Sequence, residues 1–359
     1  MVKLDGKIRK ARKKDRSCLQ ELEEEWRLLK KSYDKERAKG KKLAWQKFTE
    51  SIEETREAAR LQKVLEKGKT NSIGTLVKDS GEFTRDKEET YEYLIEKHFP
   101  GAKKRIDDVN LDTALPTWTR EEMSIIEKVV TKEKIEEIVK GLGKWKACGN
   151  DEIHPIHLQQ SLEIIIDHLV EMFQTSLRLN HIPDIWLRCN VIFIPKPNKD
   201  VSKWDGNRCI SLINHLPKIL EKLIDIRMRE VELKLKPLHK AQKGFMKNAS
   251  IDNALHESTS FIENALENKR EAVGIYLDFS MAFNLLSFQS IEKAMKDFDI
   301  PVILRNWLSR FLRERVLRAR ESQSEEYFSC ASGVPQGATS APTLFNMAIN
   351  DLLVKLSRK

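Results

Sequence analysis

The sequence predicts a mixed α+β fold, and three observations support this prediction. Apolar residues make up 40% of the chain against 33% charged residues, which is enough for a packed core. Many apolar residues recur at three- and four-residue spacing, as in amphipathic helices, whereas Cys189–Pro195 and Ala272–Phe279 are continuous apolar runs of strand length. Predicted helices and strands do not alternate strictly, which favours α+β over a doubly wound sheet.

The first 120 residues divide into two predicted parts. Residues 1–66 have the composition of charged helices with thin apolar stripes, and we expect 39–42 to interrupt them. The polar excess predicts long, exposed helices rather than a compact core. Residues 67–120 are a predicted linker with short elements, namely a strand at 73–77 and a helix at 87–96.

Residues 121–359 are predicted to form the main domain, with its core motifs in 189–359. Thr131 and Ser340 are placed to cap the first and the last of its main helices. Ala272–Phe279, which is rich in β-branched and aromatic residues, is the predicted central strand. The other expected elements are a buried strand at 189–195, helices around 162–177, 217–235, 251–268, 287–298 and 302–313, and a hairpin of 316–320 with 326–330.

The composition argues against several classes of protein. No window holds the eighteen or so uninterrupted apolar residues that a spanning helix needs, so no membrane partner is expected. The first 20 residues are basic and lack an apolar stretch, so no secretion signal is expected. The five cysteines are scattered without a C-x-x-C pair, which argues against a disulfide framework or a typical zinc site. We therefore expect a reducing, intracellular location, in the nucleus or the cytoplasm.

The formal net charge is +9, and the densest basic run lies near the N-terminus. Six cations without an acid attract polyanions, nucleic acid first. A solvated helix face or a nuclear import signal has the same composition, so these alternatives stay open. The predicted nucleic-acid-binding residues of this run are Lys7, Arg9, Lys10, Arg12, Lys13 and Lys14.

An acid, Asp278, stands near the end of the apolar run 272–279. A carboxylate at the exit of a buried strand must be hydrogen-bonded or bound to a metal, because burying a bare charge is costly. Capping of the next turn is the plainer explanation. Nucleotidyl transfer requires carboxylates that hold two magnesium ions about 4 Å apart, so one acid needs partners.

Several short motifs follow one another along the chain, namely I-P-K-P at 194–197, N-R-C-I-S-L at 207–212, K-I-L-E-K-L-I at 218–224, L-D-F-S-M-A-F-N at 277–284 and G-V-P-Q-G at 333–337. Their order resembles that in the reverse transcriptase of LINE-type (non-LTR) retrotransposons. The first three are similar to its fingers motifs, the fourth to its first palm motif and the fifth to its second. The resemblance implies the fingers and part of the palm of a right-hand polymerase, preceded by the charged helical segment.

The resemblance also implies roles for individual residues. Asp278 and the backbone carbonyl of Phe279 would bind magnesium, and Asp278 would be the catalytic carboxylate. Lys196 and Arg208 would contact the incoming deoxynucleoside triphosphate, and Phe283 would exclude a 2′-hydroxyl. Gln336 and Gly337 would line the pocket for nucleotide and template. Locally, each of these residues also has a plainer interpretation, such as an exposed turn lysine at 196, an Arg208–Asp205 pair, or a core aromatic at 283.

Several departures from the family pattern predict that the chain alone does not polymerise DNA. No Asp-Asp pair follows Gln336, although the family has an aromatic-Ala-Asp-Asp hairpin there; Asp107-Asp108 precedes every other motif. The expected metal site therefore has one of its three carboxylates. The loop at 146–152 has Glu152 where the family has glycine, and the template-gripping pattern at 242–248 ends in Asn248 rather than glycine.

Three functional readings follow. The first is a fragment of an RNA-directed DNA polymerase, whose partners would be an RNA template, an RNA/DNA hybrid and deoxynucleoside triphosphates. The second is a catalytically silent nucleic-acid-binding module derived from a retroelement. The third is a helical interaction protein that uses residues 1–66, although their apolar stripes are too irregular for sustained heptads.

Overall fold

The computed structural model describes residues 19–50, 73–105, 116–247 and 249–357. The chain divides into two units, Met1–Ser72 and Ile73–Lys359. The predicted nucleic-acid-binding run Lys7–Lys14 and the Asp107-Asp108 pair lie outside the described residues. No described helix combines the length and the apolar character that crossing a membrane requires.

The first unit contains one long helix, α2 (Leu19–Glu50), and the expected interruption at residues 39–42 is wrong. A single glycine inside a helix costs only about 1 kcal/mol relative to alanine, and the residues around Gly40 are good helix formers. Lys39 also forms an ion pair with Glu36, one turn away (2.7 Å). The apolar residues Leu28, Tyr33 and Leu43 of α2 are exposed, as the polar composition predicts.

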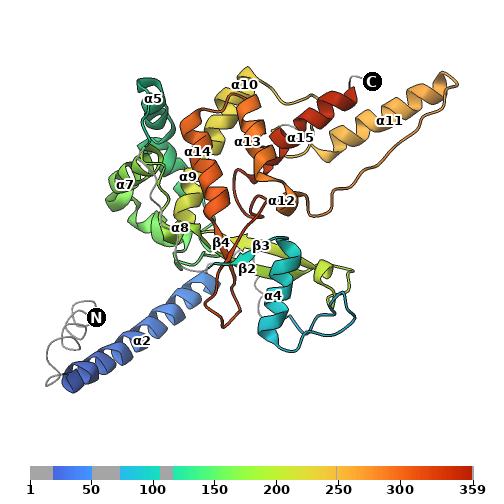
Figure 1. Ribbon diagram of the computed structural model, residues 1–359. Coiled ribbons are helices and arrows are strands. Elements are labelled where there is room, and N and C mark those ends of the chain that lie inside the picture. The colour runs from blue at the N-terminus through green and yellow to red at the C-terminus, as the bar shows by residue number, and fades with distance from the viewer. Residues whose placement is uncertain (1–18, 51–72, 106–115, 248, 358–359) are drawn as a thin grey trace. The chain divides into compact units, whose positions relative to one another are not determined.

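The second unit is built around a mixed sheet of five strands in the order β1-β5-β4-β2-β3 (Figure 1). The predicted buried strand is confirmed as β2, which pairs with β3 on one side and runs parallel to β4 on the other. The predicted hairpin is confirmed as the antiparallel pair of β4 and β5. The strands are β1 (Lys103–Lys104), β2 (Arg188–Pro195), β3 (Asn207–Leu212), β4 (Val316–Ala319) and β5 (Phe328–Ser329). The expected strand at 73–77 is reduced to one bridge between Val77 and Phe83.

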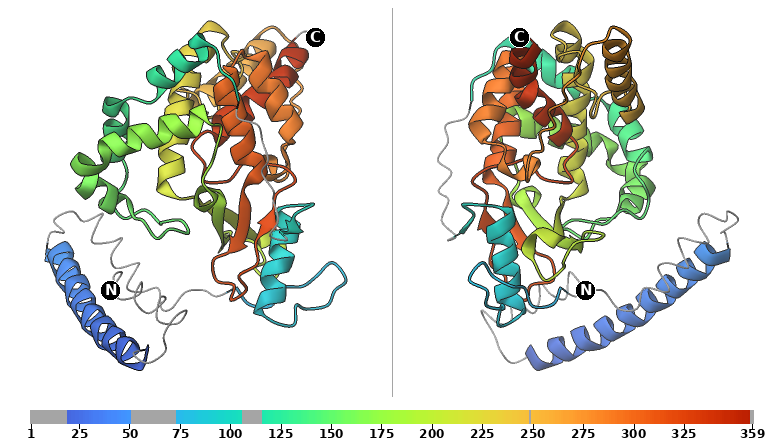
Figure 2. Two further views of the ribbon diagram at one scale, coloured as in Figure 1. Left: turned by 60° about the vertical axis from the view of Figure 1, so that its left-hand side comes forward. Right: turned by 90° about the vertical axis from the view of Figure 1, so that its right-hand side faces the viewer.

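Helices pack around this sheet, and most lie where the apolar periodicity predicts them. Thr131 caps α6 by accepting from the N–H of Lys134, as expected. Both views of Figure 2 show α4 (cyan) beside the strands and α13 to α15 (orange and red) above them. The helices are α4 (Lys87–His98), α5 (Arg120–Val129), α6 (Lys132–Lys140), α7 (Pro155–Arg178), α8 (Asp184–Leu187), α9 (His215–Arg227), α10 (Leu233–Leu235), α11 (Ile251–Glu267), α12 (Ala282–Leu285), α13 (Phe288–Asp297), α14 (Val302–Glu314) and α15 (Ala341–Ser357).

The predicted central strand at 272–279 is wrong. This segment follows α11, which projects from the rest of the unit in Figure 1, and it joins no sheet in the described structure. Its apolar side chains face water, since Val273 is 82% and Tyr276 is 93% exposed. A continuous apolar run indicates that the segment prefers burial. It becomes a strand of a sheet only if a neighbouring strand pairs with its backbone. The central position of the sheet belongs to β4 instead, with β5 on one side and β2 on the other.

Candidate nucleotide-binding site

The β2–β3 ribbon presents two cations on one exposed face. Arg208 lies opposite Ile194 in the antiparallel register, so their side chains project from the same face. Lys196 extends the ladder by donating its N–H to the carbonyl of Gly206 (2.8 Å), and side-chain alternation along the strand places it on that face too. The Lys196 ammonium donates to the carbonyl of Asp205 (2.8 Å). No ion pair to Arg208 is present among the described residues, so the suggested Arg208–Asp205 pair is not formed.

The turn at 336–337 meets the free edge of β3. The N–H of Ser211 donates to the carbonyl of Gln336 (2.9 Å). Gly337 has a φ of +134°, and a Cβ atom there would lie 2.5 Å from the carbonyl oxygen of Ser211. Only glycine permits this close approach of two backbones. Gln336 is exposed and therefore lies at the edge of the strand that carries Arg208.

The same turn is bonded to the residues that follow Asp278. Gly333 donates its N–H to the carbonyl of Leu286 (2.7 Å), and Val334 donates to the carbonyl of Phe283 (2.8 Å). Gly333 has a φ of +86°, and an added Cβ would lie 2.4 Å from the carbonyl oxygen of Asn284. The two segments, separated by about fifty residues of sequence, therefore form one backbone junction.

The ring of Phe283 is half-buried in a group of three aromatic side chains. It stacks on Phe345 of α15 with 5.2 Å between centroids, and Phe245 meets it edge-on at 6.1 Å. Such pairs fix ring orientation beyond what burial alone provides. Phe245 is 56% exposed and adopts a φ of +58°, so its ring is held at the surface next to Phe283.

Two buried carboxylates on α9 hold the start of α15, and sequence reasoning missed both. Glu221 accepts from the N–H groups of Thr339 (3.1 Å) and Ser340 (3.0 Å) and from the Ser340 hydroxyl. Asp225, one turn later, accepts from the hydroxyl of Thr343 and from Arg229. A carboxylate near the unpaired N–H groups of a helix start is electrostatically favourable.

Complete burial raises the pKa of Glu221 above its ordinary value, while these hydrogen bonds oppose the rise. The Ser340 hydroxyl donates its hydrogen to Glu221. Ser340 therefore does not cap α15 with its own side-chain oxygen. The spacing of Glu221 and Asp225 on an apolar helix was the available signal, because both share a face with buried neighbours.

The segment at 239–244, which includes the start of the template-gripping pattern at 242–248, is anchored on α15. Gln242 donates to the side-chain oxygen of Asn346 (3.0 Å), and Asn346 donates to the carbonyl of Gly244 (2.9 Å). The N–H of His239 donates to Asn350 (2.7 Å). Residue 248, where the family pattern has glycine, lies outside the described residues. Elsewhere, Glu152 occupies a left-handed conformation (φ +57°) where the family loop has glycine.

Asp278 and Phe279 stand apart from this network. Both are exposed, and no hydrogen bond or ion pair in the described structure links Asp278 to another residue. Within the described ranges, no three His, Cys, Asp or Glu side chains are grouped closely enough to hold a metal ion. Asp351, the nearest acid after the second palm motif, lies on the surface of α15 and pairs with Lys355 (2.8 Å).

Comparisons with known proteins identify the matched part of the chain. Residues 194–359 match the family model described as reverse transcriptase (RNA-dependent DNA polymerase). The chain is 29% identical over 233 residues to the RNA-directed DNA polymerase from mobile element jockey of Drosophila melanogaster, an alignment that covers 64% of this chain and 25% of that protein.

Two other relatives extend the similarity. The jockey polymerase of Drosophila funebris is 26% identical over 75% of this chain and 29% of its own length. A Pol polyprotein from type-1 retrotransposable element R2 of Popillia japonica is 27% identical over 51% of this chain and 25% of its own length. The chain thus spans about a quarter of the length of the curated relatives it matches. These matches confirm the resemblance to LINE-type (non-LTR) elements.

Proposed function

We propose that this chain supplies the fingers and part of the palm of an RNA-directed DNA polymerase. Two findings support this proposal: residues 194–359 match the reverse transcriptase family, and the similar proteins come from non-LTR elements. In the complete reaction, a primer 3′-hydroxyl attacks the α-phosphate of a deoxynucleoside triphosphate opposite an RNA template. The template–primer hybrid is held in a basic groove through its phosphates rather than its base edges.

The junction between β3, the turn at 333–337 and α12 carries this proposal. Backbone hydrogen bonds there join the segments that carry Arg208, Phe283 and Gln336, although these residues come from three separate motifs. In our proposal Lys196 and Arg208 contact the triphosphate, because a guanidinium offers a planar fork and an ammonium a mobile point charge. Phe283 lies under the incoming sugar, and its stacking on Phe345 keeps it in place to exclude a 2′-hydroxyl.

We further propose that the chain alone binds nucleotide but does not polymerise. Magnesium would supply the charge that stabilises the attacking and leaving oxygens, and Asp278 with the carbonyl of Phe279 would hold it in the complete enzyme. Two ions need several oxygen ligands in near-octahedral geometry, and one exposed carboxylate does not provide them. What the chain's own residues can do is bind and orient the triphosphate and the sugar.

The test uses the purified chain with magnesium, all four deoxynucleoside triphosphates and a primed RNA template. We expect no primer extension, together with measurable deoxynucleotide binding by isothermal titration calorimetry. Arg208→Ala should weaken nucleotide binding roughly tenfold, about 1.4 kcal/mol. The matched control is Arg120→Ala, an exposed arginine at the start of α5, which should leave nucleotide binding unchanged.

Extension by the wild-type chain that Asp278→Asn abolishes would contradict the proposed inactivity. Equal nucleotide affinity in the wild type and in Arg208→Ala would contradict the proposed nucleotide site.

The second candidate is a catalytically silent nucleic-acid-binding module. The exposed position of Asp278 outside any sheet favours it, because such a carboxylate is not oriented for metal binding. Salt-dependent binding of RNA without any deoxynucleotide binding would select this candidate over the first.

A further inference from the structure

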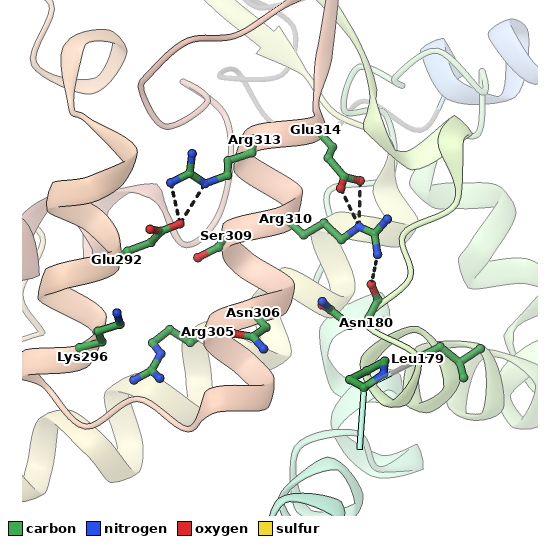
Figure 3. A pocket seen from close by; sticks show the side chains of 11 residues that line it. Leu179, Asn180, Glu292, Lys296, Arg305, Asn306, Ser309, Arg310, Arg313 and Glu314 are labelled. Carbon is green, nitrogen blue, oxygen red and sulfur yellow. Dashed lines mark hydrogen bonds and ion pairs between the residues drawn. The ribbon is translucent and has the colours of Figure 1, made fainter. Parts of the chain in front are cut away.

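A pocket of about 680 Å³ lies between α13, α14 and the end of α7, away from the candidate nucleotide site. None of the predicted catalytic or nucleotide-binding residues lines it. Figure 3 shows its wall, to which α13 contributes Glu292 and Lys296 and α14 contributes residues from Arg305 to Glu314. The pocket therefore belongs to the helical layer and not to the β2–β3 ribbon.

Two ion pairs fix the pocket wall. Arg310 pairs with Glu314 (2.8 Å) and donates to the carbonyl of Asn180 (2.6 Å), which ties α14 to the turn after α7. Arg313 pairs with Glu292 (2.9 Å), which ties α14 to α13. Figure 3 shows both pairs as dashed lines. Each carboxylate of the pocket is thus already neutralised by an arginine.

Positive charge remains after this pairing. Lys296 and Arg305 line the same pocket, and neither has an ion-pair partner among the described residues. Lys296 is exposed, and within the described residues the Arg305 guanidinium donates one hydrogen bond, to the carbonyl of Ile300 (3.5 Å). The pocket therefore offers two uncompensated cations to a ligand.

We propose that this pocket binds the phosphates of a single-stranded nucleic acid, at a site separate from the nucleotide-binding junction. Arginine and lysine are the phosphate-binding side chains, and a fixed wall reduces the entropy that ordering them costs. The wall carries no aromatic ring on which a base would stack, so recognition is through the backbone and independent of sequence. The choice of nucleic acid over another polyanion rests on the proposed function.

The test measures fluorescence anisotropy of labelled single-stranded RNA and DNA of one length, with the whole chain, across a range of salt concentrations. The double variant Lys296→Gln/Arg305→Gln should lower affinity on the order of tenfold at 0.1 M salt. The slope of log affinity against log salt should fall by about 1.4, because each phosphate contact to a single strand contributes about 0.7. An equal loss for RNA and DNA shows recognition through phosphate alone, whereas a loss for one of them identifies which strand the pocket holds.

Lys128→Gln is the matched control, because Lys128, like Lys296, is an exposed lysine in the last turn of its helix. It should leave both affinity and salt slope unchanged. A loss in Lys128→Gln as large as in the double variant, or an unchanged slope in the double variant, would overturn the proposal. Competition by polyglutamate as strong as by unlabelled RNA would also overturn it, since the pocket would then accept an acidic protein.

A second arm separates this inference from the proposed function. If Lys196→Gln/Arg208→Gln weakens deoxynucleotide binding while Lys296→Gln/Arg305→Gln leaves oligonucleotide binding intact, the pocket inference fails and the proposed function stands. If the chain binds no deoxynucleotide but its oligonucleotide affinity depends on Lys296 and Arg305, the proposed function fails and the pocket inference stands.

Discussion

The two segments that resemble palm motifs have opposite environments in this chain. Residues 331–346 donate and accept hydrogen bonds with β3, α9 and α12, and Val334 and Leu344 are fully buried. Residues 272–280 contact little else, and Ile275 is 83% and Leu277 72% exposed. Residues 272–280 are the more apolar of the two and yet are the exposed ones, so composition does not explain the difference. What separates them is whether the described structure provides partners for their backbone groups.

This difference shows which half of the candidate site the described residues form without further partners. The half that we propose to bind nucleotide is fixed by backbone hydrogen bonds and by the buried carboxylates of α9, so it is formed by the described residues alone. In the half that carries Asp278, the apolar side chains stay in water. Each Å² of apolar surface that is not buried forgoes roughly 25 cal/mol of stabilisation. Substitutions in the two segments should therefore have very different costs.

The largest expected effect is that of Gly333→Ala. The new Cβ would lie 2.4 Å from a backbone oxygen at a φ of +86°, so the junction with α12 must open or shift. We expect a loss of about 3 to 4 kcal/mol in the free energy of unfolding, measured by urea denaturation. Gly274→Ala is the control in the exposed segment, where an added Cβ meets only the flexible side chain of Tyr276. A similar loss in both variants would remove the contrast between the segments.

The next effect concerns pH and the packed region around β2. His98 lies against Phe193 and Trp204, and burial lowers its pKa from 6.5 to about 4. In the folded chain the imidazole stays neutral while the unfolded chain takes up protons below pH 6.5. The stability contributed by neutral His98 is therefore complete above pH 6.5 and is lost as the pH falls to about 4, by up to about 3 kcal/mol.

Denaturation at pH 7 and pH 4.5 checks this dependence. His98→Gln should reduce the difference between the two pH values, whereas the exposed His168→Gln should not. An unchanged difference in His98→Gln would show that other groups control the acid sensitivity.

Matched valines provide a smaller and more local comparison. Val191 on β2 is 1% exposed, and Val273 is 82% exposed. Replacing either with threonine keeps the shape and adds a hydroxyl. Val191→Thr should cost about 2 kcal/mol, since the hydroxyl is buried between paired strands. Val273→Thr should change the free energy of unfolding by less than about 0.5 kcal/mol. Equal costs in a denaturation series would mean that the 272–280 segment is buried in solution.

Much of the fold could be predicted from the sequence, because the spacing of apolar residues indicates which side chains are buried. The amphipathic pattern of Leu162, Ile166, Leu169 and Phe173 predicts α7, and all four side chains are buried. The environment of the segment at 272–279 could not be predicted, because an apolar run does not indicate which strand, if any, pairs with it. The continuity of α2 through Gly40 was missed because a glycine among strong helix formers costs too little to end a helix.

The candidate site was predictable only in part. Motif order indicates that 333–337 is a turn near the nucleotide, but the contact between Gln336 and Ser211 depends on the path of β3, which no local pattern encodes. Glu221 and Asp225 were missed because acids on a helix usually face water. The functional roles of six residues remain predictions, namely those of Lys196, Arg208, Phe283, Gln336, Gly337 and Asp278.

Hydrogen exchange of the native chain, followed by mass spectrometry, tests the contrast most directly. We expect the amides at 273–279 to exchange at nearly unprotected rates, while those of β2 and β3 exchange more slowly by at least about a thousandfold. Protection of 273–279 comparable to that of β2 would contradict this expectation, because the segment bearing Asp278 would then be paired with a neighbouring strand.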